Sequence, residues 1–297
     1  MVSLDQWFAS GSRIPVWFPA GSGGTRGYEV FCLRQGSGPW ITFLHGFPTC
    51  SWDWAPVAER LQSRHRLLLF DFLGFGDSDK PARHAYSLFD QASITEQLWR
   101  RFDVPGAVLV AHDYGVTVAQ ELLARLAEGR LAVRLEGLVL MNGGLYPEVH
   151  RPLRIQKLLA DRLLGPLMNR FVNESTFRRN FASIFTRQHP VGEEELRQHW
   201  QAIVRRDGLR NYHRLMQYWH ERRRYRDRWV GALEQTRVPL RFLWGMEDPI
   251  SGAHMAAVIR QRLPRAEFVP LEGVGHYPQL EVPDVVAAGI AAPFKGT

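Results

Sequence analysis

Residues 107–116 combine a short apolar run with an aspartate that stands between small residues. Ala111 and Gly115 lie two positions before and two positions after Asp113, and apolar residues at helical spacing follow over 116–126. A strand that turns sharply into a helix needs small residues at these two positions, so the spacing predicts a nucleophile elbow. Such a turn presents Asp113 at a helix N-terminus, where backbone N–H groups favour negative charge.

An aspartate in this position predicts attack on a saturated carbon. The product would be an alkyl ester of Asp113, and water can attack the carbonyl of that ester and regenerate the enzyme. A serine that attacked the same carbon would give an ether, which water does not cleave under mild conditions. The alternative is an aspartate that only caps the helix. The partners described next favour the nucleophile.

Two more polar residues directly follow predicted strands. Asp248 comes after the apolar run 239–244, and His276 comes after the run 267–271. Ligands of parallel sheets bind beyond the carboxyl ends of the strands, so these side chains should meet Asp113 there. Taken singly, the histidine could be structural and the aspartate a turn residue. As an ordered set they predict a triad in which Asp113 attacks, His276 deprotonates water and Asp248 orients the imidazole.

Attack of water on an ester creates an oxyanion that needs preorganised hydrogen-bond donors. We predict that the backbone N–H groups of Phe47 and Tyr114 supply them. Tyr114 directly follows the nucleophile, and Phe47 lies in the His-Gly-Phe-Pro loop at 45–48, after another apolar run. The alternative for this loop is an ordinary tight turn.

Apolar runs alternate with helical patterns along most of the chain, which predicts a parallel, doubly wound α/β sheet. The expected strands are 28–33, 40–44, 66–72, 107–111, 138–141, 239–244 and 267–271, and the clearest helices are 55–61, 87–102 and 253–262.

The alternation stops between 147 and 231, where helical spacing and long polar stretches predict an inserted helical cap. The core domain would then comprise residues 1–146 and 232–297. The first 27 residues are rich in Gly, Ser and Pro, and we expect an irregular arm there.

Six strings resemble the α/β-hydrolase superfamily, and specifically its epoxide hydrolase and haloalkane dehalogenase branch. They are His-Gly-Phe-Pro-Thr (45–49), Asp-Phe-Leu-Gly-Phe-Gly (71–76), His-Asp-Tyr-Gly (112–115), Asn-Gly-Gly (142–144), Arg-Trp-Val-Gly-Ala-Leu (228–233) and His-Tyr-Pro-Gln-Leu-Glu (276–281). The same strings are similar to the mesoderm-specific transcript proteins, which are themselves hydrolase-like. The resemblance implies an α/β-hydrolase fold with a mostly parallel eight-stranded sheet flanked by helices, a helical cap, and no cofactor or metal.

Within this branch, the His-Gly-Phe-Pro string is typical of epoxide hydrolases. Haloalkane dehalogenases usually hold the halide with a Trp after the nucleophile and with an Asn or a second Trp elsewhere, whereas this chain has Tyr114 and, in the loop, Phe47. The resemblance therefore implies hydrolysis of an epoxide to a vicinal diol. Haloalkane dehalogenation is the second hypothesis, and a non-catalytic ligand-binding or interaction protein on the same scaffold is the third.

Ring opening of an epoxide needs an acid, because an unprotonated alkoxide is a poor leaving group. Epoxide hydrolases use cap tyrosines, which makes Tyr218 the first candidate here and Tyr212 the second. Tyr218 and Tyr225 are seven residues apart and are predicted to share a helix face. The alternative is that these tyrosines only pack or face water.

Composition limits the partners. The chain has 297 residues, is 45% hydrophobic and carries a net charge of +7, but its 37 basic residues include only three lysines. This skew is more simply explained by coding bias than by nucleic-acid binding. Nine arginines fall within 205–228; we interpret them mainly as a solvated helix face, with an anionic substrate or acidic partner as the alternative.

The cysteines and the apolar runs give further expectations. Cys32 and Cys50 have no metal-ligand spacing and are predicted to be buried thiols. No apolar run approaches the roughly 18 residues of a membrane span, and no signal-peptide pattern is present. We therefore expect a cytoplasmic enzyme that acts on a small apolar electrophile and binds no nucleic acid, with a homodimer left open.

Overall fold

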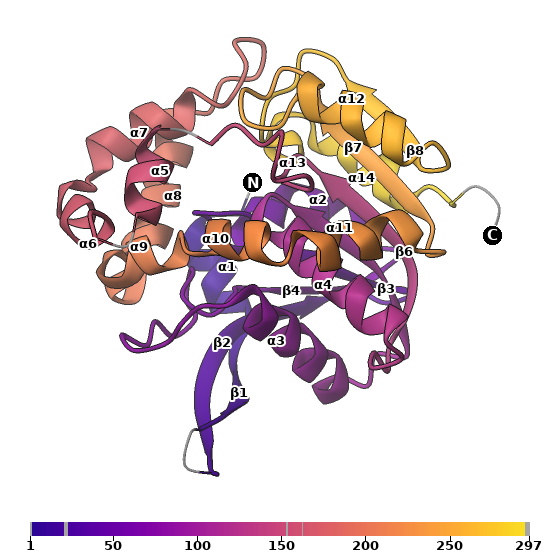
Figure 1. Ribbon diagram of the computed structural model, residues 1–297, viewed down its shortest axis with the longest axis horizontal. Helices are drawn as coiled ribbons and strands as arrows, with labels where there is room; N and C mark the ends of the chain where they lie inside the picture. The colour runs from indigo at the N-terminus through magenta and orange to yellow at the C-terminus, as the bar shows by residue number, and fades with distance from the viewer. Residues whose placement is uncertain (1, 21–22, 153, 162, 295–297) are drawn as a thin grey trace.

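The computed structural model describes residues 2–20, 23–152, 154–161 and 163–294. Within them, one eight-stranded sheet has the order β1-β2-β4-β3-β5-β6-β7-β8 (Figure 1). The first two pairings in this order are antiparallel and the others are parallel. The predicted fold class is therefore confirmed. The strands are β1 Ser12–Pro19, β2 Thr25–Gln35, β3 Trp40–Leu44, β4 Arg66–Phe70, β5 Gly106–His112, β6 Arg134–Met141, β7 Leu240–Gly245 and β8 Glu267–Leu271.

Helices cover both faces of the sheet, because successive strand residues point to opposite sides. In β4, Leu68 and Phe70 belong to one hydrophobic cluster, and Leu67 and Leu69 belong to the other. The first cluster includes side chains of α3 (Leu88–Arg101), α4 (Tyr114–Ala127), α11 (Arg226–Gln235) and α12 (Ala253–Arg262). The second includes α1 (Leu4–Ser10), α2 (Ala55–Leu61) and α14 (Pro283–Ala291).

The segment between β6 and β7 is helical in the described residues. Figure 1 shows α5 to α9 gathered at the left of the view, away from β7 and β8. The elements are α5 Arg154–Ala160, α6 Gly165–Met168, η2 Asn169–Phe171, α7 Glu174–Ala182, α8 Glu193–Val204, η3 Arg205–Asn211, α9 Tyr212–Leu215 and α10 Tyr218–Arg224. The expected boundary at residue 231 falls inside α11, which packs along α4. The division into core and cap stays a prediction.

The expectation of an irregular arm over 1–27 is wrong for the residues that are described there. Ser3 and Gln6 form a capping box that starts α1, which satisfies backbone N–H groups at the helix N-terminus. β1 then pairs antiparallel with β2 at the edge of the sheet. An edge strand tolerates Pro15, because that residue needs no inward backbone donor. The Gly, Ser and Pro content of this segment obscured both elements.

Three smaller observations bear on the expectations above. Cys32 and Cys50 are both free and buried. Within the described residues, no helix is both long enough and apolar enough to cross a membrane. The same residues include no group of three or more His, Cys, Asp or Glu placed to hold a metal ion.

Candidate active site

Asp113 occupies a sharp turn between β5 and α4. Its backbone has φ 44° and ψ −103°, a sparsely populated conformation that costs about 1–3 kcal/mol. Two glycines make room for it. A Cβ on Gly115 would lie 2.5 Å from the carbonyl oxygen of Leu44, and a Cβ on Gly143 would lie 2.8 Å from that of Asp113. The strand-turn-helix geometry of a nucleophile elbow is therefore present, and the small residues are needed for packing.

The carboxyl group of Asp113 is buried and already bound by one of the expected oxyanion donors. Its Oδ2 accepts a hydrogen bond of 3.0 Å from the backbone N–H of Phe47, and the residue is 3% exposed. Tyr114 begins α4, so its N–H is among those with no carbonyl partner inside the helix. Oδ1 of Asp113 has no hydrogen-bond partner in the described part of the chain, which leaves it available to a substrate.

His276 and Asp248 are in direct contact. Nδ1 of His276 and Oδ2 of Asp248 lie 2.7 Å apart, and both side chains are buried. Burial favours the neutral form of each group, but mutual attraction and hydrogen bonding outweigh it. The pKa of His276 is therefore raised above its ordinary value, and the pKa of Asp248 is lowered. This geometry fixes the tautomer that leaves Nε2 of His276 able to accept a proton.

Sequence reasoning missed the residues that hold Asp248. Asn142, at the end of β6, donates from Nδ2 to Oδ2 of Asp248 and to the carbonyl oxygen of Gly245, both at 2.9 Å. Its Oδ1 accepts from the N–H of Gly245 at 2.7 Å. Ser251 donates to the same carboxylate oxygen at 2.6 Å. The Asn-Gly-Gly string directly after a predicted strand was the signal that could have indicated Asn142.

Glu281 fixes the loop that carries His276. Its carboxylate accepts hydrogen bonds from the N–H groups on either side of the histidine, at 2.9 Å from Gly275 and 3.2 Å from Tyr277. The same carboxylate binds Thr186, which follows α7. The backbone N–H of His276 itself donates to the carbonyl oxygen of Ile184 at 2.9 Å. The segment between β6 and β7 is thus hydrogen-bonded directly to the loop that carries His276 and to Glu281.

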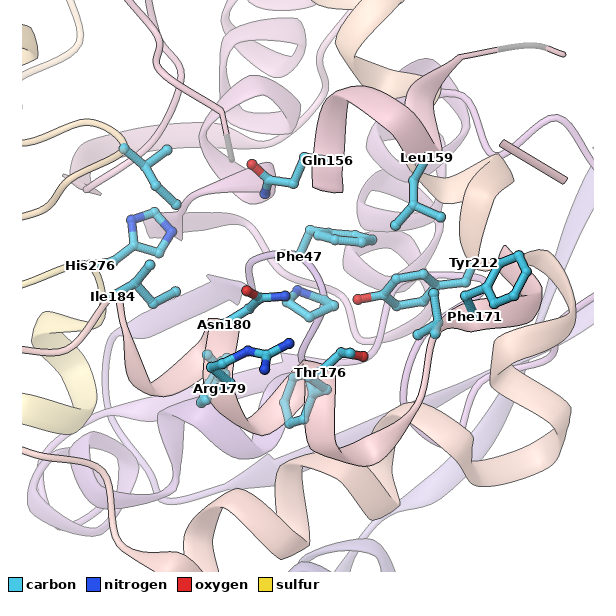
Figure 2. Close-up of a pocket in the computed structure, with 15 residues that line it drawn as sticks. Phe47, Gln156, Leu159, Phe171, Thr176, Arg179, Asn180, Ile184, Tyr212 and His276 are labelled. Atoms are coloured by element: carbon cyan, nitrogen blue, oxygen red, sulfur yellow. The ribbon is translucent and has the colours of Figure 1, made fainter. Parts of the chain in front are cut away.

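A cavity of about 300 Å³ has His276 among its lining residues. Figure 2 shows His276 at one end and Tyr212 toward the other, with Phe47 between them. Its walls are mainly apolar, and the apolar liners include Phe47, Leu159, Phe177, Phe181, Ile184 and Ile250. Asp113 does not line this cavity itself and borders it through Phe47 and His276. A mainly apolar lining of this kind is typical of sites that bind apolar ligands.

The two candidate acids occupy different positions. Tyr212 lines the cavity, and Figure 2 shows its hydroxyl directed inward. Tyr218 lies deeper, with its ring 5.1 Å from that of Tyr114 and 6.1 Å from that of Phe47. Neither hydroxyl has a hydrogen-bond partner within the described residues. Burial raises the pKa of both, and the charge of Asp113 raises that of Tyr218 further, so both are protonated and able to donate.

The prediction that Tyr218 and Tyr225 share a helix face is wrong. α10 ends at Arg224, and α11 begins at Arg226, so Tyr225 stands at the break between them. Its ring packs against Phe89 at 4.8 Å, away from the cavity. Tyr225, with φ −107° and ψ 22°, is the non-helical residue that separates the two helices.

The arginine-rich segment is only partly a solvated face. Arg205 and Arg206 pair with Asp77 and Asp79, and Arg226 and Arg228 also form ion pairs. Arg222 departs most from the expectation, because it is 1% exposed. Its Nε donates to Oγ1 of Thr117 at 2.7 Å, and its Nη2 donates to the backbone carbonyl of Asp113 at 2.9 Å.

Comparison with known proteins shows the family of the chain. A family model described as alpha/beta hydrolase fold matches residues 39–283. The chain therefore belongs to the α/β-hydrolase fold family. Within the family it is similar to the mesoderm-specific transcript homolog protein of Bos taurus, with 43% identity over 255 residues that cover 84% of this chain and 76% of that one.

Solved structures show the same fold. The haloalkane dehalogenase DatA from Agrobacterium tumefaciens, in a mutant form, superposes with a TM-score of 0.75 and 21% identity, covering 94% of each chain. The epoxide hydrolase CorEH gives a TM-score of 0.68 and 17% identity, covering 93% of this chain and 96% of that one. At these identities, both likenesses concern the fold alone.

Proposed function

We propose that this hydrolase-fold protein is an enzyme that opens an epoxide through a covalent ester on Asp113 and releases a vicinal diol. The observation that carries the proposal is the 3.0 Å hydrogen bond between Oδ2 of Asp113 and the N–H of Phe47. One carboxylate oxygen already lies at an oxyanion donor, and the other has no partner. A carboxylate held in this way is prepared both to attack and to be hydrolysed afterwards.

The first half-reaction forms the ester. Oδ1 of Asp113 attacks a ring carbon of the epoxide, and the bond from that carbon to the ring oxygen breaks. The departing oxygen takes a proton from the hydroxyl of Tyr212 or Tyr218, and a tyrosinate remains. General acid catalysis of this kind contributes about 10²–10⁴-fold in rate.

The second half-reaction releases the diol. Nε2 of His276 takes a proton from water, and the resulting hydroxide attacks Cγ of Asp113. The negative charge then develops on Oδ2, where Phe47 and Tyr114 donate. Collapse expels the diol oxygen, which takes the proton from His276. The new carboxylic acid of Asp113 loses its proton to the tyrosinate, so the charges balance over the cycle.

Haloalkane dehalogenation is the second candidate, and it requires no acid because a halide leaves unprotonated. A haloalkane dehalogenase of Agrobacterium fabrum supports it, with 31% identity over 58% of this chain. Against it, the ring of Tyr114 packs between Phe72 and Phe75, at 5.4 Å from each. The residue after the nucleophile therefore offers the cavity no side-chain donor for a halide.

A single turnover in oxygen-18 water tests the covalent step. With the enzyme in excess over a terminal alkyl epoxide, the first diol released should contain only ordinary oxygen, and the peptide that carries Asp113 should gain the heavy isotope. Heavy oxygen in that first diol would mean that water attacks the epoxide directly, and the proposal would fail. Turnover of alkyl bromides but not epoxides, measured as bromide release, would favour the second candidate.

A further inference from the structure

The cavity contains one permanently charged side chain whose role the proposed reaction does not explain. Arg179, on α7, is the one lysine or arginine among the described residues that line the cavity. The described lining includes no aspartate or glutamate. Figure 2 shows the guanidinium directed toward the middle of the cavity. A cation at the edge of an apolar cavity, with no acidic side chain beside it in the lining, attracts anions.

The guanidinium of Arg179 has no partner of its own in the described part of the chain. It forms no ion pair there, although many arginines of the cap do. Its neighbour Arg178 pairs with Glu174 at 3.4 Å and also contacts Glu193. The two arginines are adjacent on the same helix, yet only Arg179 faces the cavity. Glu174 and Glu193 thus contact Arg178, and neither forms an ion pair with Arg179.

A second donor lies in the same wall. Asn180 lines the cavity, and its side-chain amide makes no hydrogen bond to the described residues. An amide N–H₂ next to a guanidinium offers donors to an oxygen anion, and arginine binds carboxylate and phosphate oxygens well. Arg179 is exposed while His276 and Phe181 are buried. The end of the cavity that carries Arg179 thus lies at the rim, and the end that carries His276 lies inside the protein.

From this polarity we infer that the substrate is an amphiphile. An alkyl body carrying the epoxide fills the apolar cavity, and a terminal oxygen anion, a carboxylate or a phosphate, pairs with Arg179 and Asn180 at the rim. The inference names the substrate class of the proposed function and rests on that function. It also makes a binding prediction that does not depend on any reaction.

The kinetic test uses four epoxides with the same alkyl chain that end in a carboxylate, a phosphate, a neutral methyl ester or an ammonium group. We expect kcat/KM to be highest for the two anions and lowest for the ammonium. In Arg179→Gln, the ratio of kcat/KM for each anion to that for the ester should fall about five- to tenfold, as expected for one partly exposed charge-assisted contact. Arg178→Gln removes the same charge outside the cavity and should leave this ratio unchanged.

The binding test uses decanoate and 1-decanol, neither of which can react. Calorimetry should show tighter binding of decanoate, a weaker preference at high salt because of screening, and loss of that preference in Arg179→Gln but not in Arg178→Gln. Equal affinity for both probes, or turnover with no preference for anions, would overturn the inference and leave the proposed reaction standing. Selective decanoate binding without turnover of any epoxide would support the anion site and refute the proposed reaction.

Discussion

The guanidinium of Arg222 donates a 2.9 Å hydrogen bond to the backbone carbonyl of Asp113. The donor comes from α10, in the helical segment between β6 and β7, and the acceptor belongs to the proposed nucleophile. The same guanidinium lies 4.6 Å from the ring centre of Tyr218, and its charge opposes the rise in the pKa of that phenol. We therefore assign Arg222 as a positioning residue for both the nucleophile and the deeper candidate acid.

Replacing Arg222 should affect ring opening more than displacement of a halide. Arg222→Met removes the cation, raises the pKa of Tyr218 and makes it a weaker acid. Single-turnover rates of ester formation should fall about tenfold or more for an epoxide and less for an alkyl bromide. Arg222→Lys should recover part of the epoxide rate. Arg223→Met is a suitable control, because Arg223 is exposed and stacks on Trp219. Equal losses with both substrates would show a role in folding or packing only.

His276→Gln should separate the two half-reactions. Asp113 can still be alkylated in this variant, but no base remains to activate water. Intact mass spectrometry after addition of an epoxide should show one added substrate mass that persists for hours. The double variant Asp113→Asn/His276→Gln should show no adduct. An adduct that formed equally in the double variant would place the alkylation on another residue.

Phenylalanine substitutions can identify the acid. If Tyr212 or Tyr218 donates the proton, its replacement by Phe should lower the rate of ester formation with an epoxide about a hundredfold. The rate with an alkyl bromide should change much less, because that leaving group needs no proton. Tyr225→Phe is the matched control, since its ring packs against Phe89 away from the cavity. Unchanged epoxide rates in both cap variants would require a different acid.

Asn142 should contribute to stability as well as to rate. Asn142→Ala removes a donor to Asp248 and two hydrogen bonds to Gly245. The free energy of unfolding should fall by about 2–3 kcal/mol, and ester hydrolysis should slow about tenfold. Ser251→Ala removes a donor to the same carboxylate without touching Gly245, so it should cost less stability. Urea denaturation and single-turnover decay of the ester would measure the two effects.

In the pH profile of ester hydrolysis, the midpoint of the acidic limb should lie above the ordinary pKa of histidine. Burial lowers the pKa of His276, but Asp248 and the other nearby carboxylates raise it more, so the net value is above 6.5. Only the neutral imidazole can take a proton from water, and ester hydrolysis should therefore fall as pH drops through this raised pKa. In Asp248→Asn the midpoint should move to lower pH, and the maximal rate should fall as well. A midpoint that did not move would show that Asp248 does not set this pKa.

The same pair should make stability depend on pH. The raised pKa of His276 contributes stability at pH values below its unfolded value, and this contribution is lost as pH rises through the folded value. The lowered pKa of Asp248 contributes stability above its unfolded value, and this is lost on acidification. Both groups are charged together between these limits, so the pair stabilises the fold most at mildly acidic pH.

The fold could be predicted where short-range signals agree with the final packing. The expected helix 253–262 and strand 267–271 coincide with α12 and β8. In the insertion, the helical character was predictable, but the individual helices were not. The break at Tyr225 has no glycine or proline to mark it in the sequence, because it falls within residues 222–228, where the helical spacing continues.

The residues of the candidate site also differ in how far the sequence could predict them. Asp113, Asp248 and His276 could be proposed because each directly follows a predicted strand. The supporting residues could not, because their partners are distant in sequence: Asn142 binds a residue 103 positions away, and Arg222 binds one 109 positions away. Arg179 gave no signal either, since only the cavity distinguishes it from Arg178.

The hydrogen bond from the N–H of His276 to the carbonyl of Ile184 joins the proposed general base to a segment that lines the cavity. If that segment moved outward, it would displace the loop of His276, and the imidazole would lose the position in which it can deprotonate water. Ester hydrolysis would then proceed only while the segment covers the cavity. The diol would have to leave by the rim near Arg179. The enzyme would in this way keep its covalent intermediate from bulk solvent until the base is correctly placed to release it.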